Sequence, residues 1–232
     1  MYSGHGCSWI SSGKWRSTMH DSMIIQQPDR PAGELVLLFH GVGSAASDLV
    51  PLGKIVADAV PHAMVVSVNA PHPSSLGRGR EWFSVVGVTE QNRPSRVAQA
   101  MGAFVDTVAH WQREAGAAPA GTTLIGFSQG AIMSLEAARR EPVLAGRIVS
   151  LSGRFALVPD SVPASIDFHF IHGAQDPVIS LQHAVDAEQE LGRLGAPVTL
   201  DVVPGLGHGV DARVASILVG RLENGLAQPQ GH

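Results

Sequence analysis

The sequence predicts a single α/β domain built on an open, mostly parallel β-sheet with helices on both faces. Of its 232 residues, 44% are hydrophobic and only 16% are charged, so enough apolar surface is available to form a core. Short apolar runs alternate with longer segments of helical period, which is the rhythm of βαβ units. The runs are apolar almost throughout instead of alternating, as is typical of parallel strands buried on both faces.

The strands are expected where apolar runs of four to six residues occur. The first, Leu35–His40, reads LVLLFH and has no polar alternation. The runs that follow along the chain are Ala63–Val68, Thr122–Phe127, Ile148–Leu151, Ile166–Ile171 and Val198–Val203. Only about fourteen residues, with two prolines, separate the fourth run from the fifth, and no other loop near the expected site is long enough for a helical lid. We therefore expect no lid domain.

Helices are expected between and after these runs. They are Ser47–Val60, Arg96–Glu114, Gln129–Arg140, Leu181–Leu194 and Asp211–Asn224. The second carries an apolar stripe at three- and four-residue spacing, from Val97 to Trp111, which suits a helix packed on the sheet. The last would stop at Gly225, a residue suited to a left-handed cap. Right-handed crossovers would wind these elements into one sheet.

The ends of the chain differ in composition from the middle. Residues 1–22 are rich in Gly and Ser and have no period, which predicts a poorly ordered N-terminal tail. The domain is expected to span residues 23–227, and residues 228–232 to form a short C-terminal tail.

Charge and cysteine content narrow the range of partners and compartments. Sixteen basic and twenty acidic side chains give a formal charge of −4 without any basic block, which argues against a nucleic-acid partner. No run approaches the ~20 apolar residues of a membrane span. The single cysteine, Cys7, permits neither an intramolecular disulfide nor a cysteine-based zinc site. We expect a cytoplasmic protein with a small-molecule partner; whether it forms a homodimer stays open.

The first motif that carries chemistry follows the third apolar run. Gly126-Phe127-Ser128-Gln129-Gly130 is a G-x-S-x-G sequence that leads directly into a predicted helix. Such a strand-turn-helix elbow presents its serine as a nucleophile, and the flanking glycines leave room for closely approaching backbones. The alternative is a tight turn whose serine only caps the helix.

A nucleophilic serine needs a base and a group that orients the base, in the chain order Ser, Asp or Glu, His. Among the downstream histidines, only His208 lies in a glycine-rich loop after a late strand. Asp176 directly follows another strand, where a carboxylate can fix the tautomer of the imidazole. The alternatives are a solvated loop histidine and an ordinary Asp-Pro turn.

Acyl transfer also needs donors for the oxyanion. The elbow offers the backbone N–H of Gln129, and the loop after the first long strand offers that of Val42. We expect His40 to hold this loop, because it precedes the serine in the chain. Gly41-Val42-Gly43 lacks the third glycine of a dinucleotide fingerprint, which argues against nucleotide binding.

Several segments together resemble the phospholipase/carboxylesterase family of α/β-hydrolases, which includes acyl-protein thioesterases. They are LLFHGVGS, GREWF, LIGFSQGAIMSLE, IHGAQDPVI and GLGHGV, and the resemblance covers nearly everything after Met23. It implies a triad of Ser128, Asp176 and His208 with backbone donors at Val42 and Gln129.

The resemblance also implies roles outside the triad. It assigns Trp82, with Phe83 beside it, to substrate binding in the acyl pocket, and Asp48 to ordering of the oxyanion loop. Replacement of Trp82 is then expected to change chain-length preference more than stability. One departure is Ser44, where many relatives have a glycine, which leaves the shape of that loop open.

The function expected from this sequence is that of a serine carboxylesterase. It would hydrolyse short- to medium-chain carboxylic esters or thioesters through an acyl-enzyme, with no cofactor and no metal. One alternative is an acyl-protein thioesterase or lysophospholipase, which accommodates a long acyl chain. Another is a non-catalytic binding protein on the same fold, since a fold does not fix a function.

Overall fold

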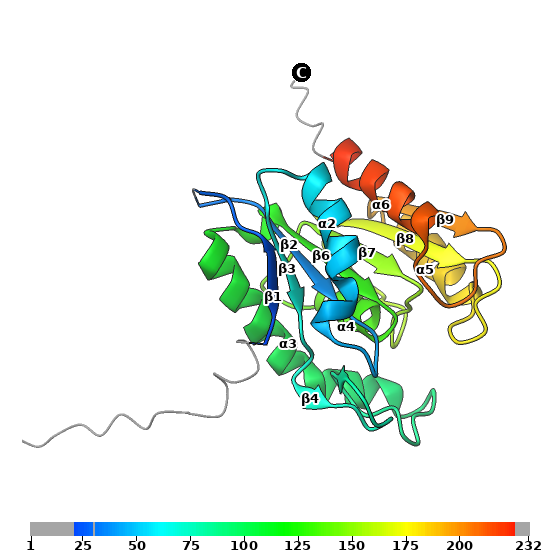
Figure 1. Cartoon of the computed structure of the whole chain (residues 1–232). Helices are drawn as coiled ribbons and strands as arrows, with labels where there is room; N and C mark the ends of the chain where they lie inside the picture. Colours follow the sequence, from blue (N-terminus) through cyan, green and yellow to red (C-terminus); the bar gives the residue numbers. More distant parts are fainter. Residues whose placement is uncertain (1–20, 30, 226–232) are drawn as a thin grey trace, which may run out of the picture.

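The computed structural model describes residues 21–29 and 31–225 of the chain (Figure 1). Most of the predicted N-terminal tail, residues 1–20, and the whole predicted C-terminal tail, residues 228–232, lie outside the described residues. Asp21 and Ser22 are described, and both contact Asn69. The Asn69 side-chain amide donates to the Asp21 carbonyl at 2.8 Å, and its backbone N–H donates to the Ser22 hydroxyl at 3.4 Å.

The domain is organised around a seven-stranded sheet in the order β1-β3-β2-β6-β7-β8-β9. Its strands are β1 (Met23–Gln26), β2 (Leu35–Phe39), β3 (Met64–Val68), β6 (Thr122–Phe127), β7 (Arg147–Leu151), β8 (Asp167–Gly173) and β9 (Val198–Val203). Every neighbouring pair is parallel except β1–β3, which is antiparallel. The predicted open, mostly parallel sheet is confirmed.

Helices cover both faces of the sheet, as predicted (Figure 1). They are α2 (Val50–Ala59), α3 (Arg93–Ala115), α4 (Gln129–Ala137), α5 (Gln182–Arg193) and α6 (Ala212–Gly225), with short 3-10 turns η1 (Ala46–Leu49) and η2 (Pro119–Gly121). Alternate residues of β2 point to opposite faces. Leu37 packs in the cluster that contains α3, α4 and α5, whereas Leu38 packs with α2 and α6. All five β2 side chains are therefore buried, which explains the unbroken apolar run.

Some elements differ from the prediction. Strand β1 and the small hairpin of β4 (His72–Pro73) and β5 (Arg80–Glu81) were not expected, because each is short and largely exposed or polar. Helix α3 begins at Arg93, three residues early, since Pro94 occupies the first turn, where its missing N–H costs nothing.

The connection between β7 and β8 contains no helix among its residues, all of which the structure describes, so no helical lid stands there. Among the described helices, none combines the length and the apolar character that a membrane crossing requires.

Candidate active site

Ser128 lies at a sharp elbow between β6 and α4. Its backbone has φ 53° and ψ −114°, in the positive-φ region that side chains rarely adopt. The neighbouring glycines explain how the turn is accommodated. A Cβ on Gly126 would lie 2.4 Å from the backbone of Ala131, and one on Gly130 would lie 2.2 Å from the Phe39 carbonyl oxygen. The close backbone approach predicted for G-x-S-x-G is present.

The structure brings Ser128, His208 and Asp176 into one hydrogen-bonded chain. The Ser128 hydroxyl lies 2.9 Å from His208 Nε2, and His208 Nδ1 lies 2.7 Å from Asp176 Oδ2. Asp176 comes from the loop after β8 and His208 from the loop after β9. Both distances are those of good hydrogen bonds, so the serine can donate to Nε2 while Nδ1–H donates to the carboxylate.

Asp176 is held as an ionised acceptor. Its side chain is fully buried, and its Oδ1 accepts the backbone N–H groups of Val178 and Ile179, both at 2.9 Å. Burial raises the pKa of Asp176, but hydrogen bonds from His208, Ile179 and Val178 together lower it below its ordinary value. The carboxylate can thus fix the His208 tautomer and stabilise an imidazolium.

Two backbone amides near the serine make no hydrogen bond within the described residues. Gln129 is the first residue of α4, so its N–H has no intrahelical acceptor. Val42 lies in the loop after β2, and its N–H donates to no acceptor within the described part of the chain. This loop passes over the elbow, since a Cβ on Gly41 would be 3.2 Å from Ser128 Cβ. Both amides can donate to an anionic oxygen.

His40 fixes the peptide that carries the Val42 amide. Its Nδ1–H donates to the Gly41 carbonyl at 2.7 Å, and its Nε2 accepts the Ala70 N–H at 3.1 Å. The ring is therefore neutral, in keeping with burial that lowers the pKa of His40. Because the Gly41 carbonyl and the Val42 N–H belong to one planar peptide, holding the first aims the second.

Asp48 orders the other side of this loop. Its Oδ2 accepts the Ser44 hydroxyl and the Ala45 N–H, the latter at 3.0 Å. The hydrogen bond from Ser44 is the main cause that lowers the pKa of Asp48. The serine that departs from the family pattern thus bonds to the carboxylate that the family resemblance assigned to this loop.

The side chain of Gln129 makes two hydrogen bonds that the sequence did not indicate. Its Oε1 accepts the Trp82 N–H at 2.8 Å, and its Nε2 donates to the Phe83 carbonyl at 2.8 Å. Gln129 is 3% exposed, so both hydrogen bonds are shielded from water. Gln129 therefore ties the residue pair 82–83 to the elbow.

Trp82 lies deeper than the sequence suggested. It is 1% exposed, and its ring centroid is 4.9 Å from that of Phe104 and 6.1 Å from that of Phe39, in the core. A cavity of about 440 Å³ is lined in part by Trp82 and Phe83, but by none of the three triad residues. Contact of Trp82 and Phe83 with an acyl chain stays a prediction, as does a larger effect of Trp82 on chain-length preference than on stability. The burial of the indole shows that its replacement also removes core packing.

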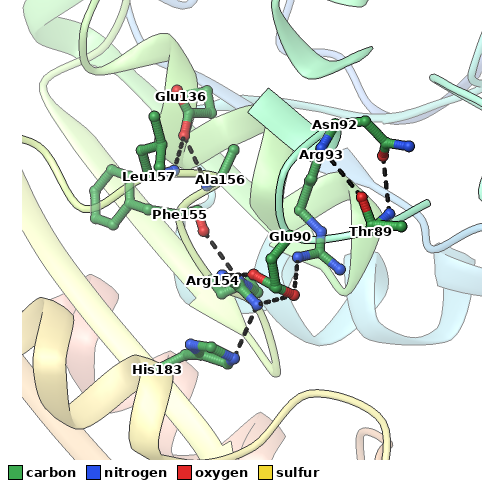
Figure 2. A network of polar contacts seen from close by, with 10 residues as sticks. All are labelled: Thr89, Glu90, Asn92, Arg93, Glu136, Arg154, Phe155, Ala156, Leu157 and His183. Carbon is green, nitrogen blue, oxygen red and sulfur yellow. Dashed lines mark hydrogen bonds and ion pairs between the residues drawn. The ribbon is translucent and has the colours of Figure 1, made fainter. Parts of the chain in front are cut away.

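Arg154, in the loop after β7, contacts residues of two other segments at the carboxyl edge of the sheet and was not singled out from the sequence (Figure 2). Its guanidinium forms a bidentate pair with Glu90, at 3.1 and 2.8 Å, and Nη1 also lies 2.8 Å from His183 Nε2. Glu90 pairs in turn with Arg93 at the start of α3. Segment 84–92, the loop after β7 and the start of α5 are thus joined.

Within the described residues, no group of three or more His, Cys, Asp or Glu side chains is placed to hold a metal ion.

Comparison with known proteins connects this geometry to a family. A family model described as Phospholipase/Carboxylesterase matches residues 20–219. Esterase YpfH of Escherichia coli (strain K12) is 47% identical over 194 residues, which are 84% of each chain. The chain belongs to the phospholipase/carboxylesterase family. The resemblance drawn from its motifs is therefore confirmed.

More distant members of the comparison agree. Acyl-protein thioesterase 1 of Kluyveromyces lactis is 27% identical over 176 residues, covering 69% of this chain and 77% of that protein. The crystal structure of esterase PE8 superposes with a TM-score of 0.74 at 29% identity, covering 83% and 92% of the two chains. Membership of the phospholipase/carboxylesterase family confirms the α/β-hydrolase fold and the prediction of a hydrolase.

Proposed function

We propose that this chain is a serine carboxylesterase that hydrolyses short- to medium-chain carboxylic esters or thioesters through an acyl-enzyme. The observation that carries the proposal is the unbroken hydrogen-bonded chain from Ser128 through His208 to Asp176. It has the geometry that an activated serine requires. The 47% identity to a protein named an esterase supports the same reaction class.

Acylation follows from the contacts around the serine. Ser128 Oγ attacks the carbonyl carbon of the ester while its proton passes to His208 Nε2, 2.9 Å away. The carbonyl oxygen gains negative charge, which the N–H groups of Val42 and Gln129 stabilise. When the tetrahedral intermediate collapses, His208 returns the proton to the departing alcohol or thiol, and the acyl group remains on Ser128.

Deacylation uses the same groups in the same roles. A water molecule gives a proton to His208 Nε2 and attacks the acyl carbon, and the proton then passes to Ser128 Oγ as the acid leaves. Asp176 Oδ2 stabilises the transient imidazolium through Nδ1–H. These steps use only side chains and amides of this chain, so we propose a reaction without metal or organic cofactor.

A second candidate is an acyl-protein thioesterase or lysophospholipase. The observation in its favour is the 27% identity to Acyl-protein thioesterase 1 of Kluyveromyces lactis. The two candidates differ in the length of acyl chain that the site accepts.

A fluorophosphonate probe tests the serine, because it reacts with an activated hydroxyl. We expect labelling and ester turnover in the natural protein and neither in Ser128→Ala. Ser152→Ala is the matched control, since Ser152 is the other described non-glycine residue with positive φ, at 49°.

The length of the acyl chain separates the two candidates, and turnover of acetyl, butyryl, octanoyl and palmitoyl esters, beside an acyl thioester, measures it. Turnover confined to the palmitoyl substrates would overturn the short-chain assignment, and full activity of Ser128→Ala would overturn the reaction itself.

A further inference from the structure

His172 is a buried, polar side chain that the reaction above does not use. It lies in β8, four residues before Asp176, and is 1% exposed. Its Nε2 is 2.8 Å from the Ile179 carbonyl oxygen and 3.4 Å from Asp176 Oδ2. His172 therefore contacts both the catalytic carboxylate and the turn that follows it.

The contacts of His172 define its tautomer. A carbonyl oxygen only accepts, so the hydrogen of the ring sits on Nε2 and points toward Ile179. Nδ1 is buried and has no partner among the described residues, so a second proton there would lack an acceptor. Burial is the main cause that lowers the pKa of His172, and the titratable groups that face the ring are the Asp176 carboxylate and the His208 imidazole. The ring acts as a neutral donor.

The donor holds the turn that carries the Asp176 carboxylate. His172 Nε2–H holds the Ile179 carbonyl, and the N–H of Ile179 donates to Asp176 Oδ1 at 2.9 Å, beside that of Val178. Oδ1 is thereby fixed on the two amides, which leaves Oδ2 directed at His208 Nδ1. At 3.4 Å the second contact, from His172 to Oδ2, is too long for a strong hydrogen bond and adds a favourable dipole.

We propose that His172 is a positioning residue for the triad: by holding the turn 176–179, it aims the Asp176 carboxylate at His208. This inference rests on the proposed function. His172 touches neither the serine nor the reacting atoms, so it acts only through Asp176. Outer-shell partners of metal ligands, which are likewise one contact removed from the reacting groups, typically change affinity or activity about 10- to 100-fold when replaced, and we expect the same order here.

Three replacements of His172 separate its donor from its volume. His172→Phe fills the space without a donor. His172→Gln carries an amide nitrogen about as far from the backbone as Nε2, whereas His172→Asn ends too early to reach Ile179. We expect kcat to fall about 10- to 100-fold in the Phe and Asn variants, with KM within about twofold. The Gln variant should recover to within about fivefold of the natural protein. If the Phe variant does not fold, the difference in kcat between the Gln and Asn variants still tests whether the donor to Ile179 matters.

A spectroscopic readout separates positioning from general damage. The proton of His208 Nδ1 in the hydrogen bond to Asp176 should give a slowly exchanging downfield NMR signal in the natural protein. It should broaden or vanish in His172→Phe and persist in His172→Gln. His169→Gln is the matched control: His169 lies in the same strand and contacts Thr199 at 2.8 Å, away from the triad. This control should keep both the signal and kcat.

The outcomes distinguish this inference from the proposed function. If Ser128→Ala is inactive but folded His172→Phe or His172→Asn keeps kcat within twofold, the positioning role is overturned and the esterase assignment stands. A Gln variant no more active than the Asn variant also overturns the role. If Ser128→Ala keeps full activity, the proposed function itself fails.

Discussion

Replacement of Trp82 by alanine tests how the aromatic core supports the site. The indole is 1% exposed and contacts the rings of Phe39 and Phe104, so its removal leaves a large cavity that the surrounding core cannot fill. Removing a buried Trp side chain typically costs about 3–5 kcal/mol. For a domain of this size, each kcal/mol lowers Tm by about 2–4 °C, so we expect a loss of about 6–20 °C.

Thermal unfolding followed by circular dichroism measures this loss, with Trp111→Ala as the matched control. Trp111 is 5% exposed and lies on α3. Both variants should lose stability, but only Trp82→Ala should change the ratio of kcat/KM between butyryl and octanoyl esters, because Trp82, unlike Trp111, lines the cavity beside Phe83. A Tm drop below about 4 °C in Trp82→Ala would refute the burial argument. The same change of ratio in both variants would refute the link to the site.

Three further predictions follow from the site. Gln129→Met should lower the free energy of unfolding by about 2–5 kcal/mol in urea titrations, since it leaves two buried backbone groups unpaired; an unchanged midpoint would contradict this. His40→Phe removes the hydrogen bond to the Gly41 carbonyl, so steady-state kcat should fall about tenfold or more at unchanged KM. This decrease should be smaller than the ~100-fold or greater decrease in kcat that follows removal of an oxyanion donor; a rise in KM alone would point to binding instead. Burial, then Arg147 and Arg221, lower the pKa of His169 from 6.5 to about 4 in the folded protein. As the pH falls from 6.5 to 4, His169 therefore binds a proton in the unfolded chain but not in the folded one, so the stability of the folded protein should fall over this range. Tm measured across this range should fall less steeply in His169→Gln, and equal slopes would refute the assignment.

The parallel strands were predictable because burial on both faces leaves a mark in the sequence. Every residue of β2 is buried, and the run LVLLF records it. Strand β1 has no such mark: its four residues are exposed or half-buried, and it forms through hydrogen bonds to β3, about forty residues away. An edge strand of this kind depends on a partner that local pattern does not reveal.

Some residues of the candidate site could likewise be predicted from the sequence, whereas others could not. Ser128, Asp176 and His208 could be proposed because each lies in the segment that follows a strand, and the carboxyl ends of parallel strands meet at one edge of the sheet. The contacts of Gln129 with Trp82 and Phe83 join residues 47 and 46 positions apart, and that of Arg154 with Glu90 joins residues 64 positions apart. Long-range polar pairs leave no periodic signal, so the structure was needed to find them.

Gln129 holds its neighbouring loop by main-chain atoms alone, the Trp82 N–H and the Phe83 carbonyl. These hydrogen bonds do not depend on the identity of the side chains at positions 82 and 83. Side chains of this segment can therefore be replaced, by mutation in nature or in a library, without disturbing the Gln129 N–H that we propose as an oxyanion donor. Substrate range and catalytic rate are then separately adjustable, and a library that varies Phe83 while keeping Gln129 should yield new specificities on an unchanged catalytic frame.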